Sequence, residues 1–91
     1  MSDAEFYDDI WTAWRDMSLY APAPRYLRRM VMKELSRLEF DSVLDAGCGL
    51  GTLLKMIGAK YPSVELNGCE LSETALEACR QHVPNAKLYR M

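Results

Sequence analysis

The stretch Val43-Leu44-Asp45-Ala46-Gly47-Cys48-Gly49-Leu50-Gly51 joins a short apolar run to three glycines, each separated from the next by one residue. An apolar run of this length with a β-branched start is typical of a buried strand, and the closely spaced glycines indicate a sharp turn. A helical pattern follows from Thr52 and ends at Tyr61-Pro62, because a residue before proline disfavours the α region. The stretch therefore predicts a strand, a glycine turn and a helix in succession.

The alternation of strand and helix continues to the end of the chain. Val64–Glu70 is predicted as a second strand, and Ser72 as the N-cap of a helix that stops before Pro84. Ala86–Met91 begins a third strand. We therefore expect an α/β fold, a Rossmann-like doubly wound parallel sheet of which this chain holds only the N-terminal βαβαβ half.

Two helices are predicted before the first strand. Ser2 and Glu5 have capping-box spacing, and the apolar period that follows indicates a helix over Asp3–Met17. A second helix has Pro24 in its first turn, with the basic side chains opposite its apolar face. The predicted apolar face consists of Leu27, Met30, Val31, Leu35 and Leu38.

The boundary between these helices and the sheet divides the chain into residues 1–40 and residues 41–91. The aromatic residues Tyr7, Trp11 and Trp14 fall along one side of the first helix, with Tyr20 after it. They suit either a plain core stripe or a lid over a ligand bound at the sheet. Residues 41–91 are expected to form a truncated ligand-binding domain.

Composition excludes several classes of function. The 91 residues are enough for one domain or part of one, and the net charge of −2 comes from scattered acidic and basic residues, which argues against a nucleic-acid partner. The three cysteines have neither metal-ligand nor disulfide-framework spacing, so no metal is expected. No signal peptide and no apolar run of membrane-spanning length is present, which predicts a cytoplasmic protein without a membrane partner.

The carboxylates Asp45 and Glu70 end the first and second predicted strands. Strand ends and helix N-termini meet at one edge of such a sheet, where ligands bind, and glycines let the backbone approach a ligand closely. A carboxylate at the position of Glu70 can accept hydrogen bonds from the hydroxyls of a ribose. The sequence therefore predicts a nucleoside-containing ligand.

Spacing and charge distinguish between the candidate ligands. A dinucleotide fingerprint reads GxGxxG, whereas this turn reads GxGxG with Thr52 where the last glycine would stand. Asp45, two residues before the first glycine, would repel a pyrophosphate, but it would attract the positive sulfonium and ammonium groups of S-adenosylmethionine. These features favour S-adenosylmethionine over NAD.

The residues also match a known family. Val43–Gly51 resembles motif I of the class I S-adenosylmethionine-dependent methyltransferases, and Glu70-Leu71-Ser72 resembles the acidic loop that follows it. The resemblance implies that Gly47 and Gly49 lie along the methionine part of the cofactor and Asp45 near its ammonium. It also implies that Glu70 holds the ribose and that Leu71 lines the adenine pocket. The full predicted cofactor site is Asp45, Gly47, Cys48, Gly49, Gly51, Glu70 and Leu71, with Arg25 of the leading helix at the cofactor carboxylate.

The resemblance implies a methyltransferase that acts on a small molecule. The family places an adenine-binding acid after the third strand and a substrate loop after the fourth strand, both beyond Met91. We therefore expect the chain to be inactive alone, with its catalytic residues outside it. His82, near a helix end, is interpreted as a surface residue. The alternatives are a non-catalytic nucleotide-binding or interaction half-domain and an NAD-type oxidoreductase fragment. The missing strands would expose a sheet edge through which the chain could self-associate.

Overall fold

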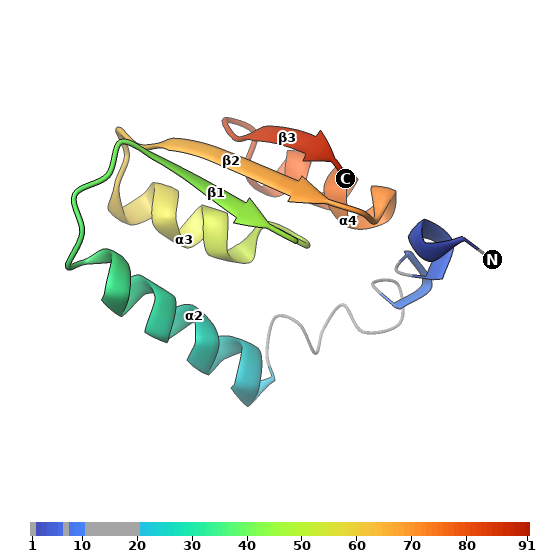
Figure 1. Ribbon diagram of the computed structural model, residues 1–91, viewed down its shortest axis with the longest axis horizontal. Helices are drawn as coiled ribbons and strands as arrows, with labels where there is room; N and C mark the ends of the chain where they lie inside the picture. The colour runs from blue at the N-terminus through green and yellow to red at the C-terminus, as the bar shows by residue number, and fades with distance from the viewer. Residues whose placement is uncertain (1, 7, 11–20) are drawn as a thin grey trace.

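The computed structural model describes residues 2–6, 8–10 and 21–91, and Figure 1 shows their arrangement. The elements in chain order are α2 (Pro22–Leu35), β1 (Ser42–Ala46), α3 (Thr52–Lys60), β2 (Glu65–Glu70), α4 (Glu73–His82) and β3 (Lys87–Arg90). Residues 3–6 and 8–10 are also helical, in agreement with the start of the first predicted helix. The rest of that helix lies outside the described residues, as do Tyr7, Trp11, Trp14 and Tyr20.

The three strands form a parallel sheet in the order β1-β2-β3. Val43 pairs with Leu66, and Gly68 pairs with Leu88, so the strands run side by side in a regular register. All three strands therefore end at the same edge of the sheet, where the glycine turn begins. This arrangement confirms the predicted α/β half-sheet.

The core lies between the sheet and the helices α3 and α4, which lie on one side of the strands in Figure 1. Leu54 and Ile57 of α3, Leu66 of β2 and Cys79 of α4 are almost completely buried. Burial of an aliphatic side chain contributes about 1.5 to 3 kcal/mol. This cluster therefore packs α3 and α4 against the sheet.

The predicted apolar face of α2 is largely wrong. Leu27 is 63% exposed and Leu38 62% exposed, whereas Met32 and Leu35 pack against the core. After α2 the chain passes through Phe40, whose ring packs edge-on against Tyr61 with 5.0 Å between ring centroids. The inward side of α2 includes Met32 and Leu35, and of these only Leu35 belongs to the predicted apolar face.

The opposite face of the sheet carries an exposed row of apolar and small side chains. Ala46, Cys69 and Tyr89 are paired across the three strands, and Leu44 precedes them on β1. Leu44 is 62% exposed and Tyr89 53% exposed. Parallel sheets are normally covered on both faces, yet no helix among the described residues covers this one.

Candidate functional site

The glycine turn connects the end of β1 to the start of α3. Gly47, Gly49 and Gly51 have φ angles of 75°, 56° and 84°, in the left-handed region that favours glycine. The amides of Gly47 and Cys48 both donate to the carbonyl of Cys69, at 2.8 and 3.0 Å. The first half of the turn is thus fastened to the end of β2.

Gly47 and Gly51 have different surroundings. A Cβ added to Gly47 would meet no atom within 4 Å, so the backbone there borders open space that a ligand can approach. A Cβ added to Gly51 would lie 2.5 Å from Sγ of Cys79 on α4. Gly51 therefore allows the turn to pack closely against α4. This packing role differs from the predicted role of Gly51 in the cofactor site.

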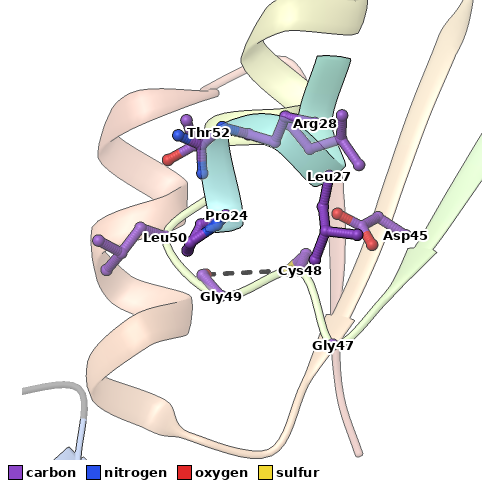
Figure 2. Close-up of a pocket in the computed structure, with 10 residues that line it drawn as sticks. Pro24, Leu27, Arg28, Asp45, Gly47, Cys48, Gly49, Leu50 and Thr52 are labelled. Carbon is purple, nitrogen blue, oxygen red and sulfur yellow. Dashed lines mark hydrogen bonds between the residues drawn. The ribbon is translucent and has the colours of Figure 1, made fainter. Parts of the chain in front are cut away.

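Asp45 faces a pocket of about 320 Å³ between the glycine turn and α2. Burial raises the pKa of the Asp45 carboxyl above its usual value, and the negative charge of Glu70 raises it further. Figure 2 shows Asp45 pointing from the end of β1 toward Leu27. The lining residues are Pro24, Leu27, Arg28, Asp45, Gly47, Cys48, Gly49, Leu50, Thr52 and Leu53.

Glu70 is buried at the end of β2, with 5% of the residue exposed. One carboxylate oxygen accepts a hydrogen bond from the Gly49 amide at 3.0 Å, and the other accepts from the Ser72 amide at 2.8 Å. A carboxylate oxygen can accept more than one hydrogen bond, so each keeps capacity for a ligand hydroxyl. The two backbone bonds hold Glu70 in place between the glycine turn and the start of α4.

The side chain of Cys48 is a packing group. Cys48 is buried, and burial, followed by the neighbouring Cys79, raises the pKa of its thiol to about 12. A Cβ added to Gly68 of β2 would lie 2.9 Å from Sγ of Cys48, so this glycine makes room for the thiol. A thiol with this pKa stays protonated at neutral pH and is a poor nucleophile.

The loop after Glu70 is contacted by the N-terminal segment. Leu71 is half-buried, and its carbonyl accepts from Nε of Arg90 at 3.0 Å. Ser72 caps α4 by accepting from the Ala75 amide. The Asp8 carboxylate accepts from the Ser72 hydroxyl and from the Thr74 amide, and these bonds lower the pKa of Asp8.

Arg25 and Arg28 are placed differently by α2. Arg25 is exposed and does not line the pocket that Asp45 faces; it lines a neighbouring hollow of about 260 Å³. Arg28 is half-buried and lines both. Sequence reasoning placed Arg28 on the solvated face, although its spacing from Pro24, Met32 and Leu35 is the helical spacing of the face that points inward.

His82 is a second residue that sequence reasoning missed. It is half-buried at the end of α4, and its Nδ1 lies 3.0 Å from the carbonyl oxygen of Leu50 in the glycine turn. The signal was present in the helical period, because Ala75 and Cys79 are buried and His82 follows at the next inward position. The interpretation of His82 as a plain surface residue is therefore wrong.

The described part of the chain also bears on metals and membranes. None of its histidine, cysteine, aspartate and glutamate side chains forms a group that could hold a metal ion. Within the same residues, no helix is long and apolar enough to span a bilayer.

Comparison with known proteins identifies the family. The family described as "Methyltransferase domain" matches residues 43–91, which include the glycine turn, Glu70 and all of the three strands except Ser42. The chain is 30% identical over 66 residues to trans-aconitate 2-methyltransferase of Variovorax paradoxus, which covers 72% of this chain and 24% of that protein. It is 34% identical over 61 residues to release factor glutamine methyltransferase of Deinococcus radiodurans, covering 67% of the chain and 22% of that protein.

A solved structure shows the same fold. The plantazolicin methyltransferase BpumL, crystallised with a desmethylPZN analog and SAH, has a TM-score of 0.63 and 25% identity over 85% of this chain and 32% of its own. The chain thus spans about a quarter of the curated relatives and about a third of the solved structure. With its parallel half-sheet and glycine turn, the chain belongs to the methyltransferase-domain family of S-adenosylmethionine-dependent enzymes, of which it covers the N-terminal part.

Proposed function

We propose that this chain forms the S-adenosylmethionine-binding part of a methyltransferase that acts on a small molecule. The observation that carries the proposal is the pairing of two carboxylates around one glycine turn. Asp45 faces an open pocket, and Glu70 is buried and held by the Gly49 and Ser72 amides. A dinucleotide would bring a pyrophosphate toward this negative charge, whereas S-adenosylmethionine brings two positive groups.

The residues present fit the cofactor. Asp45 would hold the ammonium of its methionine part, and Arg28, in the same pocket, would hold the carboxylate. The open space at Gly47 admits the methionine chain, and the remaining acceptor capacity of Glu70 suits the ribose hydroxyls. Leu71, just beyond, would border the adenine. The bound cofactor supplies a methyl group on a positively charged sulfur.

The chain's own contribution to the reaction is alignment. Methyl transfer is an in-line displacement, and precise positioning of the reacting groups supplies much of the acceleration. Cys48, with a thiol pKa of about 12, is unsuited to act as a nucleophile or a base. We propose that the acceptor site and any base belong to the part of the relatives' length that this chain does not span.

The small-molecule acceptor is supported by the relatives. Trans-aconitate 2-methyltransferases of Variovorax paradoxus and Afipia carboxidovorans both match the chain. Release factor glutamine methyltransferase, whose name indicates a protein acceptor, matches a similar length, so protein methylation is the second candidate. The purified 91-residue chain should transfer no radiolabelled methyl group to trans-aconitate or to a release factor. Transfer to either would contradict the proposal that the acceptor site lies in the part of the relatives' length that this chain does not span.

We further propose that the N-terminal residues form a lid over the ribose and adenine end of the cofactor. The Asp8 contacts to Ser72 and Thr74 support this, because they place the N-terminal segment beside the residues that follow Glu70.

Isothermal titration with S-adenosylhomocysteine and NADH tests the cofactor assignment. We expect weak binding of S-adenosylhomocysteine and none of NADH. Glu70→Ala should weaken binding by about 1 to 3 kcal/mol, because the ribose hydroxyls lose a charged acceptor. Glu77→Ala is the matched control, since Glu77 is exposed on α4 and forms an ion pair with Arg80. Tighter binding of NADH, or equal loss in both variants, would refute the assignment.

A further inference from the structure

The second half of the glycine turn accepts a side-chain hydrogen bond from α4, and it comes from His82. The Nδ1 atom of His82 lies 3.0 Å from the Leu50 carbonyl oxygen. A carbonyl only accepts hydrogen bonds, so Nδ1 must carry a proton. The bond links two segments that are 32 residues apart in the chain.

This contact complements those made by β2. The amides of Gly47 and Cys48 are held by the Cys69 carbonyl, and the Gly49 amide by Glu70, so β2 fastens the first half of the turn. Leu50 lies beyond these contacts, between two glycines with positive φ. Glycines give the unrestrained backbone many alternative conformations, so a second anchor matters most at Leu50.

The anchor also connects both parts of the cofactor site. Gly49 and Leu50 line the pocket that Asp45 faces, and the amide of Gly49 donates to Glu70. Movement of Leu50 would therefore displace Gly49 and with it the hydrogen bond to Glu70. Helix α4 begins beside Glu70 at Ser72 and reaches the turn again at His82, so one helix braces the site at both ends.

We infer that His82 is a positioning residue, which holds the glycine turn in its cofactor-binding conformation by donating a hydrogen bond from Nδ1 to the Leu50 carbonyl. The inference rests on the proposed function, because it concerns affinity for S-adenosylmethionine. His82 does not line the pocket and acts through the turn.

Three substitutions separate the hydrogen bond from simple packing. His82→Asn places an amide nitrogen where Nδ1 stands, His82→Gln places one near Nε2 instead, and His82→Leu removes the donor while keeping an apolar side chain of similar reach. Gln81→Leu, at the exposed neighbouring position on α4, is the matched control.

Calorimetric titration of the 91-residue chain with S-adenosylhomocysteine provides the first measurement. The Leu and Gln variants should bind about fivefold more weakly, equivalent to about 1 kcal/mol for one net hydrogen bond, while the Asn variant and the control stay within about twofold. Thermal melts show that each variant is folded. If His82→Leu binds like the unaltered chain, or His82→Asn loses as much as His82→Leu, the inference is wrong.

A second measurement does not depend on cofactor binding. Hydrogen exchange by NMR should show faster exchange of the Gly51 amide in His82→Leu than in His82→Asn, and the ring ¹⁵N shifts of the unaltered chain should show a proton on Nδ1. If the chain fails to bind S-adenosylhomocysteine but shows this pattern, the proposed function fails and the anchoring of the turn stands. Equal exchange in the two variants refutes the anchoring.

Discussion

Asp45 illustrates, at the scale of one residue, a conflict between binding and stability. Its half-buried carboxyl lies near the buried Glu70, and both burial and the Glu70 charge raise its pKa. A carboxyl whose pKa is higher in the folded than in the unfolded chain is protonated more readily when folded. Its ionised form therefore destabilises the fold above that pKa, and lowering the pH through the raised pKa removes this cost.

We predict that Asp45→Asn stabilises the chain and weakens its binding to S-adenosylhomocysteine. At pH 7 the melting temperature should rise, because the substitution removes a charge that burial disfavours. Affinity should fall at least about tenfold, because the ligand ammonium loses a charged partner. Calorimetry and thermal melts at pH 7 and pH 5 check both effects, and the gain in stability should shrink at pH 5. An Asn variant that is less stable and binds equally well would contradict this role.

Arg25 and Arg28 of α2 provide the second prediction at this scale. Arg28 shares the pocket with Asp45, and Arg25 lines only the neighbouring hollow. Arg28→Gln should therefore weaken S-adenosylhomocysteine binding by about 1.5 to 3 kcal/mol, through loss of a charge-assisted hydrogen bond to the ligand carboxylate. Arg25→Gln, the matched control, should change binding by less than about 0.5 kcal/mol. A larger loss of affinity in Arg25→Gln than in Arg28→Gln would support the sequence-based prediction that Arg25 binds the cofactor carboxylate.

At the scale of elements, the glycine turn is the junction between sheet and helices. We predict that Gly47→Ala destabilises the fold by about 1 to 2 kcal/mol, the cost of a left-handed conformation, since the added Cβ enters open space. Gly51→Ala should cost about 1 to 3 kcal/mol more, because its Cβ would collide with Cys79. Urea denaturation of both variants measures the difference. Equal losses of stability in the two variants would mean that α4 shifts at no cost to make room for the added Cβ at position 51.

The contact between Asp8 and the start of α4 gives a further prediction for the elements. Hydrogen bonds from Ser72 and from the Thr74 amide lower the pKa of Asp8, so its contribution to stability is present above the unfolded-state pKa and is lost as pH falls through the lowered value. Asp8→Asn should lower the protection factor of the Thr74 amide against hydrogen exchange at pH 7, and should abolish the fall in that protection factor at acidic pH. Asp9→Asn, at an exposed neighbour, should leave exchange unchanged.

Elements were more predictable from the sequence than the orientation of their side chains. The strand Ser42–Ala46, the Ser72 cap and the helix end before Pro84 follow from local patterns of apolar, capping and proline residues, and the structure confirms them. The inward face of α2, where Met32 and Leu35 pack against the core, does not follow from the apolar pattern of its sequence. Helical spacing places Arg28 and His82 on the inward sides of their helices, but the groups that they meet there depend on packing between elements.

At the scale of the whole molecule, the sheet formed by the described residues has two unpaired edges, on β1 and on β3, and one uncovered face. β1 pairs with β2 on one side, and no strand among the described residues pairs with its other side. The exposed apolar side chain of Leu44 lies on this strand, and the open face continues through Ala46, Cys69 and Tyr89. Unpaired edges with apolar side chains are templates for association with another chain, and the strand Ser42–Ala46 contains no lysine or proline to prevent it.

We therefore predict that the 91-residue chain self-associates through the β1 edge. Light scattering coupled to size exclusion should report a mass above that of the 10.4 kDa monomer. Leu44→Lys should shift the population toward monomer, since a charge on an edge strand disfavours pairing, while Leu38→Lys, at a position with the same 62% exposure but outside the sheet, should not. A monodisperse monomer of the unaltered chain with a cooperative melt would refute the prediction. Monomer formation by both variants alike would show that general apolar exposure, and not the strand edge, drives the association.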